Sequence, residues 1–239
     1  MQRRTLAASL MLGAVAPGIA WSQRAAAPAP AVSAVPAAPT GAAASATAAA
    51  PVAPAAPGAI DIAGIKFDPA VRVGTHNLKL NGAGIRWKAV FKVYAAALYL
   101  AAPADTPEAV LASPGAKRIH LVALRTIEAN ELGKAFTDAL EKNASRDEFV
   151  RSLQPIIEMG QVTSAYRALQ HGDSIVFDWV PGSGTTMFVK GKAEMGPVQD
   201  PAFFAAMTKI WLGNKPADAQ LKEALLGKKV ERDSSVSGA

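Results

Sequence analysis

Side chains that could perform chemistry are sparse in this 239-residue chain. The three histidines, His76, His120 and His171, lack the spacing of metal ligands, both to one another and to carboxylates. The chain has no cysteine, and it contains no Gly-x-Ser-x-Gly elbow, phosphate-binding loop or dinucleotide-binding fingerprint. The sequence therefore predicts no metal site and no cofactor.

Arg86 and Tyr94 lie on neighbouring segments of the chain, and their spacing limits whether they can act together. Arg86 follows a glycine-rich segment, residues 81–84, that is predicted to be a turn or bulge. Tyr94 lies within residues 87–100, which give the strongest strand signal of the chain. Their even spacing puts both on one sheet face, but eight residues of straight strand would separate them by ~26 Å. They can share a ligand only if the chain bends between them. Otherwise Arg86 is a solvated arginine at a strand end and Tyr94 an ordinary sheet aromatic.

The elements that must position these residues follow from hydrophobic periodicity and capping signals. Strands are expected over residues 67–72, 77–80, 87–100, 117–126, 163–170, 174–180 and 185–190. Helices are expected from Thr106 to about residue 114, over 128–143, from a capping box at Ser145 to about 158, over 201–213 and over 216–226. Strands joined by hairpins, with helices inserted in blocks, indicate an α+β fold: a largely antiparallel β-sheet with a layer of helices on one face.

The ends of the chain have their own compositions. A basic start at Arg3 and Arg4, an apolar stretch and the small-residue exit Ala20-Trp21-Ser22 predict a signal peptide over residues 1–22, rather than a retained membrane anchor. Residues 23–59 are rich in Ala and Pro and are expected to form a disordered linker. One domain is expected over residues 60–228, followed by a disordered tail over 229–239. An exported protein, most simply periplasmic, is the expectation.

Charge and hydropathy narrow the range of partners. The formal net charge is +6, and no dense Lys/Arg run lies on a predicted helix. We therefore expect no nucleic-acid binding, and a solvated surface with some attraction to anionic ligands or lipid. No segment after the signal peptide is long and apolar enough to span a membrane. The sequence does not indicate an oligomeric state.

Two segments together resemble a known family. Residues 82–86, Gly-Ala-Gly-Ile-Arg, and residues 92–100, Lys-Val-Tyr-Ala-Ala-Ala-Leu-Tyr-Leu, are similar to the chalcone isomerase-like fold family. That family includes plant flavonoid cyclases, plastid fatty-acid-binding relatives and exported bacterial homologues. Residues 210–213, Ile-Trp-Leu-Gly, also resemble the bacterial members. The resemblance covers residues 62–226 and implies an antiparallel sheet backed by helices, with a ligand cleft between them.

The resemblance also implies roles for particular residues. Arg86 matches an arginine that holds the substrate oxyanion in the cyclases and the carboxylate in the fatty-acid binders. Tyr94 matches a hydroxyl residue that assists it, and Asn143 matches a cleft asparagine. Phe136 and Phe204 stand where the cyclases have hydroxyl groups. Losing such donors would cost a few kcal/mol of transition-state stabilisation each.

These departures favour a binder over an enzyme. The expected function is non-catalytic binding of a small amphipathic anion such as a fatty acid, with Arg86, Tyr94, Phe136 and Asn143 at the ligand. One alternative is an isomerase (an intramolecular lyase) that closes a ring in a chalcone-like substrate through Arg86, Tyr94 and Asn143. Another is a protein-interaction module of the cell envelope. Phe136 and Asn143 can also be read as ordinary core and cap residues of the helix over 128–143.

Overall fold

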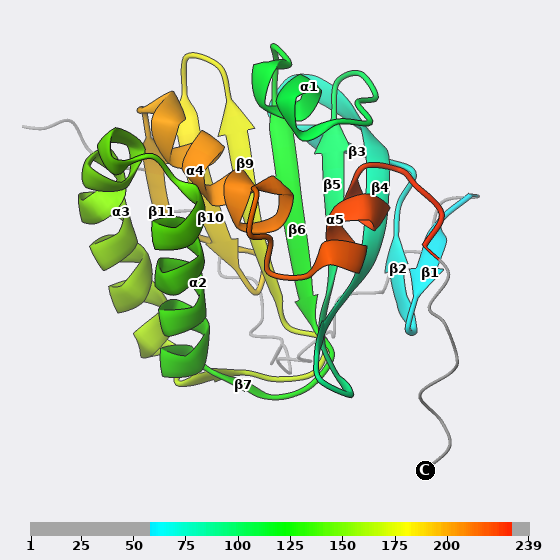
Figure 1. Cartoon of the computed structure of the whole chain (residues 1–239), viewed down its shortest axis with the longest axis horizontal. Helices are drawn as coiled ribbons and strands as arrows, with labels where there is room; N and C mark the ends of the chain where they lie inside the picture. The colour runs from blue at the N-terminus through cyan, green and yellow to red at the C-terminus, as the bar shows by residue number, and fades with distance from the viewer. Residues whose placement is uncertain (1–57, 231–239) are drawn as a thin grey trace, which may run out of the picture. The chain divides into compact units, whose positions relative to one another are not determined.

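The structure, a computed structural model, describes residues 58–230. The predicted signal peptide, nearly all of the predicted linker and most of the predicted tail lie outside the described residues. The described part is α+β, as the sequence predicts (Figure 1). Its centre is a seven-stranded sheet of order β11-β10-β9-β6-β5-β4-β3, in which all neighbouring strands are antiparallel.

The strands of this sheet are β3 (Ala70–Val73), β4 (His76–Lys88), β5 (Phe91–Leu100), β6 (Lys117–Ala123), β9 (Ser174–Val180), β10 (Gly184–Val189) and β11 (Lys192–Val198). Two short pairs lie outside it: β1 (Ile60–Ile62) with β2 (Ile65–Phe67), and β7 (Ile127–Glu128) with β8 (Ala168–Leu169). The helices are α1 (Pro107–Ala112), α2 (Ala129–Asn143), α3 (Arg146–Ala165), α4 (Pro201–Leu212) and α5 (Ala219–Leu225). The helices α2, α3 and α4 cover one face of the sheet, and α5 lies against β4 (Figure 1).

The core lies mainly between the sheet and the helices. Along β5 the side chains alternate in the usual way of a strand: Ala96, Leu98 and Leu100 face the helix-side core, whereas Ala97 and Tyr99 belong to a smaller cluster that includes Phe67 of β2. Because both faces of β5 are covered, the strand reads as a nearly continuous apolar run rather than as an alternating one.

Most predicted elements are present, and two predictions were wrong. The single strand over residues 87–100 is instead two strands, because the chain reverses at Ala89 and Val90 between β4 and β5. Residues 81–84, predicted to be a turn or bulge, are part of β4, and the register shift at Asn81 fits the bulge. Of the strand expected over residues 163–170, the first three residues belong to α3, which buries Met159 and Thr163, and only Ala168–Leu169 form a strand, β8. Val162 and Thr163 favour strands in isolation, but the packing of α3 outweighs this preference here.

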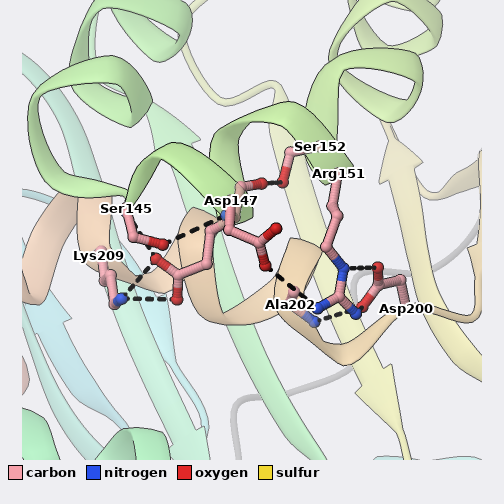
Figure 2. Close-up of polar contacts among 8 residues, drawn as sticks. Ser145, Asp147, Arg151, Ser152, Asp200, Ala202 and Lys209 are labelled. Carbon is pink, nitrogen blue, oxygen red and sulfur yellow. Dashed lines mark hydrogen bonds and ion pairs between the residues drawn. The ribbon is translucent and has the colours of Figure 1, made fainter.

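Polar contacts fix α3 to α4 (Figure 2). Ser145 and Glu148 form the predicted capping box at the start of α3, and Glu148 also binds Nζ of Lys209 on α4 at 2.7 Å. Arg151 donates two hydrogen bonds to Asp200, the N-cap of α4, at 2.8 and 2.6 Å. Exposed ion pairs contribute little free energy, but a bidentate pair restricts geometry. These contacts set the position of α4 over the sheet.

Two glycines of β4 permit the close approach of α5. A Cβ atom at Gly82 would overlap the carbonyl oxygen of Ala224, and one at Gly84 would lie 2.7 Å from Cβ of Ala224. Hydrogen bonds also join β4 to α5 at this contact. Asn81 donates to the carbonyl of Leu225 at 2.8 Å, and the backbone N–H of Trp87 donates to Asp218, the N-cap of α5, at 2.9 Å. The glycine-rich motif of β4 is therefore the surface on which α5 packs.

This packing predicts that Gly82→Ala destabilises the fold. The added methyl group meets backbone atoms, which cannot move aside as a flexible side chain can, so we expect a loss of about 1–3 kcal/mol, as for other overpacked sites. In a thermal melt this corresponds to a decrease in Tm of roughly 2–10 °C for a domain of this size. The matched control is Gly133→Ala in α2, where a Cβ meets nothing within 4 Å. This control should be neutral or stabilising by up to about 1 kcal/mol. Equal behaviour of the two variants would contradict the account.

Candidate functional site

The β4–β5 hairpin, α2 and the end of α4 surround a cavity of about 200 Å³. Its apolar lining includes Val93, Ile127, Leu132, Phe136 and Ile210. Its polar lining consists of Arg86, Lys88, Tyr94, Glu131, Lys134 and Asp138. The cavity thus combines apolar walls with charged groups. Three of the four ligand-site residues expected from the sequence line it: Arg86, Tyr94 and Phe136.

The hairpin brings Arg86 and Tyr94 together. They are directly opposite each other in the antiparallel pair of β4 and β5, and Cζ of Arg86 lies 5.6 Å from the centre of the Tyr94 ring. The ~26 Å separation of a straight strand does not apply, because the chain turns at Ala89 and Val90. Ala89 adopts a positive φ of 52°, which is uncommon for a residue with a side chain. The sequence lacked the Asn-Gly or Asp-Gly signal usual in such hairpins.

Tyr94 is held in the core by a hydrogen bond. Its hydroxyl oxygen accepts from Nε1 of Trp211 on α4 at 2.9 Å, and both side chains are buried. Burial raises the pKa of Tyr94 to about 12, although the nearby Arg86 charge and the Trp211 hydrogen bond act in the opposite direction. The phenol therefore stays protonated at neutral pH. Because its oxygen accepts from Trp211, its own proton is available to a ligand.

Charges around the cavity are paired, except at Arg86. Lys88 binds Glu131 at 3.1 Å, and Lys134 binds Asp138 at 2.7 Å. Within residues 58–230, the half-buried Arg86 forms no ion pair. Its recorded contact is the Tyr94 ring, which is attractive for a cation but leaves the N–H donors of the guanidinium unused. The arrangement offers an anion a bidentate partner beside a neutral hydroxyl donor.

Phe136 and Asn143 of α2 have different surroundings. Phe136 lines the cavity and packs edge-on against the Trp211 ring, with centroids 5.9 Å apart. Asn143 does not line the cavity. Its amide donates to the carbonyls of Ala139 and Lys215 and accepts from the Lys215 N–H, all at 2.7–2.9 Å. These bonds join the end of α2 to the segment after α4, so we leave Asn143 out of the proposed site.

Phe204 also lies away from this cavity. Its ring packs against Trp179 with centroids 6.2 Å apart, and it lines a different cavity. On α4 the residue that lines the Arg86 cavity is Ile210. Phe204 therefore does not mark a position on α4 from which a hydroxyl group could reach the Arg86 cavity.

Trp211 is the functional residue to which the sequence assigned no role. A buried indole needs an acceptor for its N–H, and this requirement is a signal that could have been followed. No sequence pattern named Tyr94 as the partner, because 117 residues separate the two.

In residues 58–230 there is no cluster of three or more His, Cys, Asp or Glu side chains that could hold a metal ion. In the same residues, none of the helices has the length and apolar composition needed to cross a bilayer.

The Tyr94–Trp211 contact predicts a stability cost for Tyr94→Phe. The change leaves Nε1 of Trp211 buried without its acceptor, so we expect a loss of about 1–3 kcal/mol in the free energy of unfolding. Chemical denaturation measures it. Tyr166→Phe is the control, because its exposed hydroxyl bonds to Glu194 and water can replace that contact. We expect it to change stability by less than about 0.5 kcal/mol. An unchanged Tyr94→Phe variant would refute a structural role for the hydroxyl.

Comparison with known proteins agrees with this fold. No curated protein matches the sequence significantly. Among solved structures, a crystal structure of a fatty-acid binding protein from Arabidopsis thaliana matches with a TM-score of 0.56 at 14% identity, covering 68% of this chain and 92% of that chain. At this identity the likeness shows the fold alone. A family model described as chalcone isomerase-like matches residues 59–227. The chain belongs to the chalcone isomerase-like family.

Proposed function

We propose that this protein binds a small amphipathic anion, such as a short- or medium-chain fatty acid, without catalysing a reaction on it. The observation that carries the proposal is the Arg86 guanidinium, which has no ion pair within residues 58–230 and lines a largely apolar cavity. A buried or half-buried cation is normally paired with a carboxylate of the protein. A carboxylate brought by a ligand would complete the pair at Arg86.

The other groups at the cavity suit the same ligand. The Tyr94 proton can be donated to the second carboxylate oxygen, since the phenol stays neutral at physiological pH. The alkyl chain would lie against Val93, Leu132 and Phe136, where each CH₂ removed from water contributes about 0.8 kcal/mol. One end of the cavity ligand is thus recognised by charge and the rest by burial.

The size of the cavity limits the length of the chain. Its volume of about 200 Å³ is below the ~300–1,000 Å³ usual for drug-sized ligands. An acid such as octanoate is therefore a better first choice than a long-chain acid. The shared fold with a fatty-acid binding protein of Arabidopsis thaliana supports the ligand class.

Binding is favoured over ring closure by what surrounds the proposed carboxylate. Phe136 lines the cavity where the family resemblance leads one to expect a hydroxyl group, and a phenyl ring cannot orient water or donate a proton. Tyr94 has one side of its hydroxyl engaged by Trp211. Asn143, the third residue of the enzymatic alternative, is fully hydrogen-bonded outside the cavity.

Export to the periplasm belongs to the same proposal. It rests on the sequence pattern of residues 1–22 and on the Ala/Pro-rich segment that follows. A binder tethered outside the cytoplasm would meet amphipathic anions from the medium or from the envelope.

The proposal predicts that Arg86→Ala weakens octanoate binding by about 1.5–3 kcal/mol, the range for hydrogen bonds to charged groups, or roughly 10- to 100-fold. Isothermal titration calorimetry measures this loss. The Tm should change little, because Arg86 forms no ion pair in residues 58–230 that the substitution would break. Arg86→Lys should recover only part of the affinity, since an ammonium lacks the planar fork.

Arg146→Ala is the matched control, because it removes the same charge from an exposed position that does not line the cavity. It should leave octanoate affinity within about twofold, the size of a screened surface effect. If Arg86→Ala binds octanoate as tightly as the wild-type chain, the proposed function is wrong.

A further inference from the structure

A second cavity of about 250 Å³ lies at the other end of α4 from the Arg86 site, between α1, the start of α4 and the sheet. Its lining is almost wholly apolar. It includes Leu111 of α1, Trp179 of β9 and Phe204 of α4, and the two aromatic rings lie 6.2 Å apart with a tilt of 31°. The polar exceptions are Lys117, the first residue of β6, and Thr208 of α4, whose hydroxyl already donates to the Phe204 carbonyl.

Lys117 is an unusual lysine. The residue is 8% exposed, and within residues 58–230 its ammonium has no hydrogen bond and no ion pair, although Nζ retains some contact with solvent. The adjacent Arg118 binds Asp178 at 2.6 and 2.7 Å, and strand alternation puts this pair on the opposite face of the sheet from Lys117. Lysine is almost never this buried unless it is paired.

Such a group is costly to the fold. Burial holds the pKa of the Lys117 ammonium below its usual value, and no neighbouring charge opposes this effect. An apolar residue of the same length would fill the space without that cost. A partly desolvated ammonium on an apolar cavity is thus placed to pair with an anion that enters the cavity.

We propose that this cavity is a second anion site, which takes a small carboxylate with a flat apolar body through Lys117. The carboxylate pairs with the ammonium, and the flat body lies against Trp179 and Phe204. The volume is again below that of drug-sized pockets, which sets the ligand at about the size of benzoate. This site is independent of the function proposed for Arg86.

A different tryptophan lies at each cavity, so binding at each can be followed separately. The chain has four tryptophans, of which Trp179 lines the second cavity and Trp211 contacts Tyr94 at the first. In ¹H–¹⁵N spectra of the whole chain, a benzoate titration should move the Trp179 indole resonance saturably. Lys117→Met should weaken that binding at least tenfold, while Arg86→Ala should leave it within about twofold.

Stability supplies a second measurement on the same variant. Lys117→Met removes an unpaired, partly desolvated ammonium and keeps the apolar stem, so its Tm should rise by roughly 2–4 °C, the size of a 1 kcal/mol effect in a domain of this size. The dispersed ¹H–¹⁵N spectrum of this variant should resemble that of the wild-type chain, which shows that it is folded. If the Lys117 ammonium already had a partner in the protein, it would stabilise the fold, and Lys117→Met would lower the Tm instead.

Three results would overturn the proposal. The first is a Trp179 resonance that benzoate does not move. The second is equal benzoate affinity in the wild-type chain and Lys117→Met, which would mean that the ammonium only reaches water from the edge of the cavity. The third is a lower Tm in Lys117→Met, which would mean that the ammonium already has a partner in the protein.

Discussion

The reversal of the chain at Ala89 and Val90 is the constraint on which the site depends. It turns a long apolar run into two antiparallel strands and places Arg86 opposite Tyr94. The positive φ of Ala89 costs about 1–2 kcal/mol relative to ordinary backbone. Packing on both sides maintains it: α5 rests on Gly82 and Gly84 of β4, and Trp211 of α4 binds Tyr94 of β5. The hairpin is thus held by helices from the end of the chain.

The way charges are paired separates structural contacts from candidate sites. Two ion pairs join α3 to α4, Glu148 with Lys209 and Arg151 with Asp200 (Figure 2). In each pair the charge of one side chain is balanced by the other. Arg86 and Lys117 differ, since neither has an ion pair within residues 58–230 and each lines a cavity with apolar walls. Both cations lie under the helix layer, one near each end of α4.

Much of this fold was predictable from local chemistry. The capping box at Ser145, the Thr106 cap before Pro107 and the Asp200 cap before Pro201 each begin a helix as expected. These signals act over three or four residues, so they survive in any tertiary context. The hairpin was missed because Ala-Val carries no turn signal, and the last two turns of α3 were missed because Val162 and Thr163 favour strands in isolation.

The candidate site was less predictable than the fold. Arg86 and Tyr94 were identified by residue type and resemblance, but their contact depends on the turn. The pairing of Tyr94 with Trp211 and the close fit of Gly82 to α5 join residues more than a hundred positions apart. Asn143 shows the reverse case, because its amide is satisfied by Ala139 and Lys215 rather than directed at the cavity. Long-range contacts of this kind leave no local pattern in one sequence.

The central claim is that the free guanidinium of Arg86 receives the carboxylate of a ligand. The most direct measurement is the carboxyl pKa of octanoate bound to the chain, followed by ¹³C NMR on carboxyl-labelled acid. An adjacent cation and a hydroxyl donor both favour the ionised form, so the account predicts a bound pKa below that of free octanoate, returning upward in Arg86→Ala. A bound pKa equal to or above that of the free acid would place the carboxyl in water or against apolar walls, and would contradict the account.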